Sequence, residues 1–134
     1  MSRPLRTTVV AVSLTALLTG CSLVSEPDAR AWDDQAERSL TDAASEVGTA
    51  RLALESAHEG RTWSSYAVVL VAQAEEAMGT AQDDLSRLQV PPGRAERAER
   101  VEQLLDDAGT AVEDARAAAV AGRYDDEALR AELA

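Results

Sequence analysis

Apolar residues recur at alternating intervals of three and four residues through long stretches of the chain, and this repeat strongly constrains the fold. In the first stretch it consists of Ala36, Leu40, Ala43, Val47, Ala50, Leu54 and Ala57. In the last it consists of Ala98, Val101, Leu105, Ala108, Val112, Ala115 and Ala119. Such spacing places one apolar stripe along an α-helix, and that stripe has to be buried against partner helices. The sequence therefore predicts a helical bundle.

The middle stretch has a less regular repeat. Its apolar positions are Trp63, Ala67, Leu70, Ala74, Ala77, Ala81 and Leu88, with Asp84 at one position and Leu85 beside it. Val68 and Val69 fall outside this repeat, on the side of the helix that should face away from the core. We expect them either to be covered by another part of the chain or to form a small apolar patch for a partner.

Gly and Pro divide the chain into helices. Gly60 and Gly122 suit the position that follows a helix C-terminus, and the Pro91-Pro92 pair ends the middle helix. The predicted helices are residues 28–59, 62–89, 92–121 and 125–133. The long helices have similar lengths and short connections, so neighbours should run antiparallel. The predicted fold is all-α: an up-down-up three-helix bundle over residues 28–134 with a short C-terminal fourth helix, preceded by a signal peptide.

The C-terminal segment Tyr124–Leu133 should emerge beside the start of the middle helix. A helix of this length is marginal alone and needs a surface on which to lie. We expect it to dock over the outer face of the middle helix near Val68. A frayed, exposed terminus is the alternative.

The first 20 residues have the layout of a signal peptide, because Arg3 and Arg6 precede an uncharged run over residues 7–20. The run is shorter than a membrane-spanning helix requires. It ends in Leu18-Thr19-Gly20-Cys21, which resembles the lipobox of bacterial lipoproteins. The resemblance implies that cleavage precedes Cys21, whose thiol takes a diacylglyceryl group. Residues 21–27 would then be the lipid anchor and linker, at the extracytoplasmic face of the cell membrane. An ordinary secretory signal with an incidental Cys is the alternative.

Composition limits the remaining chemistry. Cleavage before Cys21 would remove Arg3 and Arg6. The mature chain would then carry 11 of the 13 Arg against 24 Asp and Glu, a formal charge of −13. This charge argues against binding to nucleic acid or adhesion to anionic lipid. Cys21 is the only Cys and His58 the only His, and no nucleophile or cofactor motif accompanies them. We predict no catalytic, cofactor or metal residues and do not expect an enzyme.

One pair of residues has a spacing found in metal sites. Glu55 and His58 match the Glu-x-x-His pair of ferritin-like di-iron bundles, but such a site needs two pairs and two further Glu. A surface ion pair is therefore the favoured interpretation. Adjacent Asp residues, as at 106–107, could loosely collect divalent cations, so an acidic metal-buffering lipoprotein is an alternative function.

Trp63, Tyr66 and Tyr124 should meet at the end of the bundle far from Cys21. With Val68 and Val69 they form the candidate partner-binding surface. The chain resembles the small Ala-rich helical lipoproteins of high-GC Gram-positive bacteria, a fold-level likeness that carries no activity with it. The expected function is a membrane-anchored binding or adaptor module with an unknown envelope protein as partner. A structural spacer, such as the trimeric major lipoprotein of Gram-negative envelopes, is disfavoured because this chain has no Lys and breaks at Gly60 and Pro91.

Overall fold

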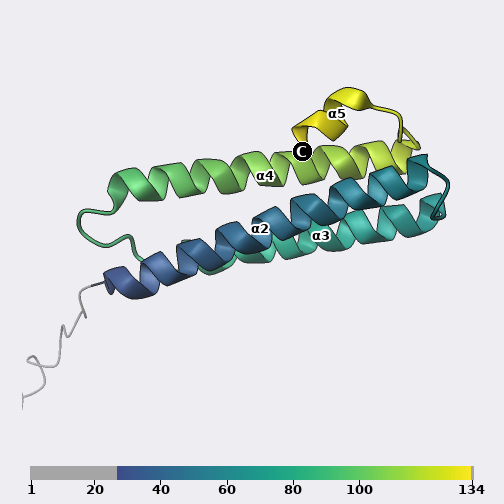
Figure 1. Cartoon of the computed structure of the whole chain (residues 1–134). Coiled ribbons are helices and arrows are strands. Elements are labelled where there is room, and N and C mark those ends of the chain that lie inside the picture. The colour runs from purple at the N-terminus through teal and green to yellow at the C-terminus, as the bar shows by residue number, and fades with distance from the viewer. Residues whose placement is uncertain (1–26, 134) are drawn as a thin grey trace, which may run out of the picture.

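The computed structural model describes residues 27–133 and shows an all-α fold, as predicted (Figure 1). Within these residues there are four helices: α2 Ala29–His58, α3 Ser64–Ser86, α4 Ala95–Ala121 and α5 Glu127–Glu132. The predicted signal peptide, Cys21 as the predicted lipid attachment site and most of the predicted linker lie outside the described residues.

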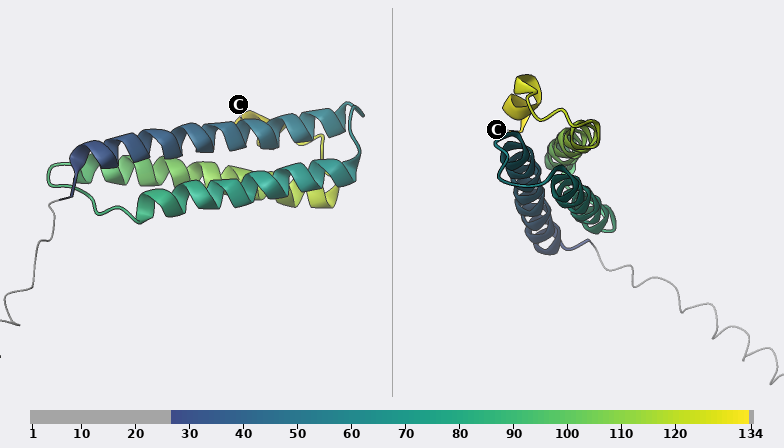
Figure 2. Two further views of the ribbon diagram at one scale, coloured as in Figure 1. Left: turned by 90° about the horizontal axis from the view of Figure 1, so that it is seen from below. Right: turned by 90° about the vertical axis from the view of Figure 1, so that its right-hand side faces the viewer.

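The three long helices form an up-down-up bundle, which confirms the predicted topology. Helix α3 returns along α2, and α4 then runs back so that each long helix packs against the other two. The end-on view in Figure 2 shows α2, α3 and α4 at the corners of a triangle, with α5 outside it. The start of α2 and the α3–α4 loop therefore lie at one end of the bundle, and the α2–α3 turn lies at the other.

The helix ends agree with the predicted ones to within three residues. Gly60 and Gly122 have positive φ angles of 69° and 67°, as expected of residues at helix C-termini. The main difference is the α3–α4 loop, which covers residues 87–94 and is longer than predicted. Residues 91–94 form a turn in which the Arg94 N–H donates to the Pro91 carbonyl at 3.1 Å, so α4 cannot begin at Pro92.

The core consists of two clusters stacked along the bundle. The cluster nearer the start of α2 comprises Trp32, Ala36, Ala43, Met78, Leu85, Ala98, Val101 and Leu105. The other comprises Ala50, Ala53, Leu54, Val71, Ala74, Ala111, Val112, Ala115, Ala118, Ala119, Leu129 and Leu133. Most predicted core positions of α2 and α4 are buried, while Leu40, Val47, Ala57 and Ala108 are half-buried.

The predicted apolar stripe of α3 was correct at Ala67, Ala74 and Ala81, which are buried, and wrong at the positions between them. The buried positions are Ala67, Val71, Ala74, Met78, Ala81 and Leu85. Trp63 is instead 83% exposed, Leu88 is 37% exposed, and Leu70 and Ala77 are half-buried. The observed register buries Leu85 in place of Asp84, which avoids the cost of an unpaired buried carboxylate.

The C-terminal segment docks on the bundle, but not at the predicted place. Helix α5 packs against α4, and Leu129 and Leu133 belong to the core cluster that contains Ala50 and Ala118. The segment therefore covers the side of the bundle formed by α2 and α4 and not the outer face of α3 near Val68 (Figure 2). The Ala side chains of α2 and α4 are small, so they leave room there for Leu129 and Leu133. The convex outer face of α3 does not offer such room.

Candidate binding surfaces

Three of the five predicted surface residues are exposed at the α2–α3 end of the bundle. Trp63 directly precedes α3, and its carbonyl accepts hydrogen bonds from Tyr66 N at 2.9 Å and Ala67 N at 3.0 Å. These bonds fix the backbone of Trp63, while its side chain is 83% exposed. Tyr66 and Val69 follow on the first turns of α3 and are 56% and 49% exposed. We call Trp63, Tyr66 and Val69 the distal aromatic surface.

The other two predicted residues have structural contacts. Val68 is half-buried and packs against the core cluster, so the chain itself covers it. Tyr124 is also half-buried, and its hydroxyl donates to the Ala119 carbonyl at 3.0 Å. This bond holds the segment between α4 and α5 onto the end of α4. Val68 and Tyr124 therefore do not contribute an open surface with the other three.

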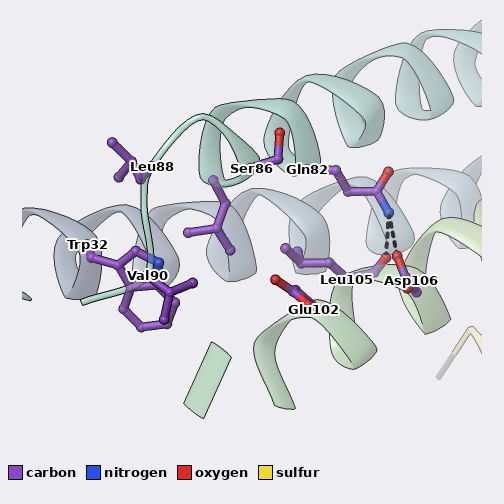
Figure 3. A pocket seen from close by; sticks show the side chains of 9 residues that line it. Trp32, Gln82, Ser86, Leu88, Val90, Glu102, Leu105 and Asp106 are labelled. Carbon is purple, nitrogen blue, oxygen red and sulfur yellow. Dashed lines mark hydrogen bonds between the residues drawn. The ribbon is translucent and has the colours of Figure 1, made fainter. Parts of the chain in front are cut away.

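A pocket of about 400 Å³ lies at the opposite end, between α3, α4 and the loop that joins them (Figure 3). Trp32, Leu85 and Leu105 are buried residues of its wall, and Leu88 and Val90 line it from the loop. Gln82, Ser86, Glu102 and Asp106 supply polar groups. The Gln82 side-chain amide donates to the Leu105 carbonyl at 3.1 Å, which braces α3 against α4 beside the pocket.

Sequence reasoning missed this pocket because Trp32 was left out of the first apolar repeat. Trp32 lies four residues before Ala36, so the repeat extends to it. Its side chain is only 2% exposed. The position of the loop over Trp32 could not be predicted, because it depends on where α3 ends.

Asp33 joins the start of α2 to the start of α4. Arg94 donates to its carboxylate from Nη2 at 2.8 Å and from Nε, which is shared between the two oxygens at 3.0 Å and 3.2 Å. Arg97 Nη1 donates to it at 2.9 Å. The Arg94 hydrogen bonds are the main cause of an Asp33 pKa below its ordinary value, and desolvation opposes them. The same bonds raise the pKa of Arg94.

The residues considered as metal ligands are not gathered into a site. His58 is exposed, and Glu55 forms an ion pair with Arg51 at 3.7 Å. Between residues 27 and 133, no group of three or more His, Cys, Asp or Glu is placed to hold a metal ion. Over the same residues, no helix is both long and apolar enough to cross a membrane.

Comparisons with known protein families, with curated proteins and with solved structures found no match.

Proposed function

We propose that the protein is a membrane-anchored, non-enzymatic lipoprotein whose bundle presents a binding surface to another protein of the cell envelope. The observation that carries this proposal is the distal aromatic surface, because Trp63 and Tyr66 are 83% and 56% exposed, whereas the other large apolar side chains exposed in the described residues, such as Leu52, Leu104 and Val120, are aliphatic. Trp and Tyr are enriched among the residues that dominate protein interfaces, because they bury a large area and lose little side-chain entropy. An exposed Trp and Tyr beside an exposed Val form a patch suited to a protein partner.

The lipid anchor would give this surface a direction. Cys21, in the lipobox-like sequence, lies eight residues before the start of α2. Helix α2 has 30 residues and is therefore about 45 Å long at 1.5 Å per residue. Lipidation of Cys21 would hold the start of α2 close to the membrane, and the distal aromatic surface would face a partner farther from it.

The anchor is tested by replacing Cys21 with Ser in the full chain expressed in a bacterium that processes lipoproteins. We expect the wild-type protein to incorporate a palmitate analogue and to fractionate with membranes. The Cys21→Ser variant should incorporate none and should retain residues 1–20. Equal labelling of the two proteins would refute the lipid attachment.

The partner surface is tested by photo-crosslinking in native membranes. A crosslinking amino acid at Ser65, which is exposed between Trp63 and Tyr66, should yield a discrete adduct with one envelope protein. The combined substitutions Trp63→Ala and Tyr66→Ala should abolish the adduct. Leu104→Ala is the matched control, because Leu104 is 55% exposed on α4 and lies outside the surface. An adduct that survives the double substitution would exclude the distal aromatic surface as the binding site.

A further inference from the structure

The pocket between α3, α4 and the loop that joins them has an apolar wall. Trp32, Leu85 and Leu105 are 2%, 5% and 3% exposed and belong to the core cluster nearer the start of α2. Leu88 and Val90 line the pocket from the loop, and each is 37% exposed. The pocket therefore reaches from the core of the bundle to its surface. Its volume of about 400 Å³ lies in the range of small-molecule binding sites.

The charged groups of the pocket are all acidic. Glu102 and Asp106 line it one helical turn apart on α4, so both lie on the same face of that helix. The other polar side chains of the lining, Gln82 and Ser86, are uncharged, and no described residue of the lining is an Arg. In Figure 3 the two acidic residues lie on the α4 side of the pocket, opposite the loop between α3 and α4. A ligand in the pocket therefore meets two carboxylates beside an apolar wall.

These two carboxylates are not neutralised by Arg side chains of the bundle. Within residues 27–133, neither Glu102 nor Asp106 forms an ion pair. At the same end of the bundle, by contrast, Asp33 and Asp84 are both paired with Arg side chains. The pocket therefore combines apolar surface with unpaired negative charge, and both features complement one kind of ligand.

We propose that this pocket binds a small organic cation. Its ammonium or guanidinium group would lie against Glu102 and Asp106, and its apolar body would pack on Trp32, Leu88 and Val90. The apolar wall contributes affinity because it removes ligand surface from water, and the carboxylates select the sign of the charge. A neutral apolar molecule would lose the second contribution, and an anion would be repelled.

A metal ion fits the pocket less well than an organic cation. Among residues 27–133, no group of three or more His, Cys, Asp or Glu is placed to hold a metal ion, and the apolar wall offers a metal nothing. The site is also independent of the lipid anchor and of the distal aromatic surface, because that surface lies at the opposite end of the bundle.

The test uses the soluble protein that begins at residue 21 and carries Cys21→Ser, because residues 27–133 contain the whole pocket. Trp63→Phe leaves Trp32 as the only Trp, so that its emission reports on the pocket wall. Phenylbutylammonium, phenylbutanol and phenylbutyrate are probes that share one apolar body and differ in charge.

We expect phenylbutylammonium to change the Trp32 emission saturably, with a Kd of about 1 mM or below. Phenylbutanol should bind about tenfold more weakly, at about threefold for each carboxylate that it cannot pair with, and phenylbutyrate should bind more weakly still.

Paired substitutions test each half of the pocket. Glu102→Gln with Asp106→Asn should weaken phenylbutylammonium about tenfold and leave phenylbutanol unchanged. Glu113→Gln with Asp114→Asn is the matched control, because both residues are exposed on α4 outside the lining, and it should change neither Kd. Leu88→Ser with Val90→Ser should weaken both probes alike, since both use the apolar wall. Circular dichroism checks that each variant keeps its helices.

Three results would overturn the proposal. The first is the absence of a saturable change in Trp32 emission up to about 10 mM phenylbutylammonium, which would remove the site itself. The second is equal affinity for phenylbutylammonium and phenylbutyrate. The third is an equal loss of phenylbutylammonium affinity in the Glu102 and Asp106 variant and in its Glu113 and Asp114 control, which would mean that the probe is attracted to the acidic bundle as a whole.

Discussion

The carboxylate of Asp33 is bound by two Arg side chains from another helix, and this contact makes the bundle sensitive to acid. Hydrogen bonding from Arg94 is the main reason that the Asp33 pKa lies below its ordinary value, and the charges of Arg94 and Arg97 act in the same direction. A carboxyl group whose pKa is lower in the folded state stabilises the fold at pH values above its unfolded-state pKa. That stabilisation is lost as the pH falls through the folded-state pKa.

We predict that Asp33→Asn lowers the melting temperature at neutral pH. The difference from wild type should shrink as the pH falls below about 3.9, the ordinary pKa of Asp, because the wild-type carboxylate then also becomes neutral. Thermal unfolding followed by circular dichroism across this pH range measures the difference. Asp34→Asn is the control, since Asp34 is an exposed neighbour and should show little effect. A difference independent of pH would contradict the role assigned to the ion pair.

Two adjacent Leu residues of α4 allow a controlled test of the core. Leu105 is 3% exposed and Leu104 is 55% exposed. Leu105→Ala should reduce the free energy of unfolding by about 2–5 kcal/mol, because it removes buried methyl groups and leaves a cavity. Leu104→Ala should change it by no more than about 0.5 kcal/mol. Urea denaturation gives both values, and equal losses would show that α4 is rotated from the orientation described.

The sequence predicted individual core residues best in α4, where every position of the predicted stripe except Ala108 is buried. Leu54 and Leu105 were predicted to be buried and are. Leu70 was predicted to be buried and is half-buried, so its truncation to Ala should cost less than that of Leu105. In α3 two adjacent apolar residues lie at suitable spacing between each two of the shared positions Ala67, Ala74 and Ala81, so spacing alone cannot choose which of them complete the stripe. Packing chose the stripe with Val71, Met78 and Leu85.

At the scale of elements, α5 is a six-residue helix that depends on the surface beneath it. Asp126 caps it by accepting a hydrogen bond from Leu129 N at 3.1 Å. One such cap stabilises a helix by about 1 kcal/mol, which does not offset the cost of ordering so short a segment. Burial of Leu129 and Leu133, which are 8% and 3% exposed, supplies the remainder.

Deletion of residues 124–134 should therefore lower the urea midpoint of unfolding and increase the fluorescence of an apolar dye. Both effects follow because Ala111 and Ala118 on α4 would lose their cover. Leu129→Ala with Leu133→Ala should reproduce most of the loss, and Glu127→Ala with Glu132→Ala should not, since these Glu side chains are exposed. An unchanged midpoint after the deletion would mean that α5 contributes nothing to stability.

The existence of α5 could be predicted from sequence, but its docking site could not. Asp126 and the apolar side formed by Leu129 and Leu133 are local signals that require no partner. The docking site was inferred from the rotation predicted for α3, and that rotation was wrong because the predicted stripe was displaced by one residue at alternate positions. With the observed register, Val68 packs against the core cluster, and Leu129 and Leu133 join Ala50 and Ala118 in that cluster.

At the scale of the whole molecule, the candidate site was predicted only in part. Trp63, Tyr66 and Val69 do lie together at the end far from the start of α2, because matched helix lengths and short turns fix which segments share an end. Val68 and Tyr124 were assigned to the surface from spacing alone, which takes no account of packing between neighbouring helices. Both residues are half-buried against the core cluster. The pocket was missed because Trp32 was left out of the first apolar repeat and because the loop with Leu88 and Val90 forms part of its wall.

The bundle should unfold as one unit from a monomer, because the apolar stripes of its three long helices are buried against one another within one chain. A lone helix with such a stripe would have to associate with other chains. The two core clusters are joined by continuous helices, so neither should unfold alone. Unfolding should therefore be cooperative and independent of protein concentration.

Trp32 and Trp63 make this prediction measurable, because they are 2% and 83% exposed. In the soluble Cys21→Ser protein lacking residues 1–20, Trp63→Phe leaves Trp32 as the only Trp, a reporter inside the cluster nearer the start of α2. Its emission should shift to longer wavelength at the same urea concentration at which helical circular dichroism is lost, and dilution should not move that midpoint. Two separate midpoints would show that the clusters unfold independently, and a midpoint that falls on dilution would show that the helices are completed by a second copy of the chain.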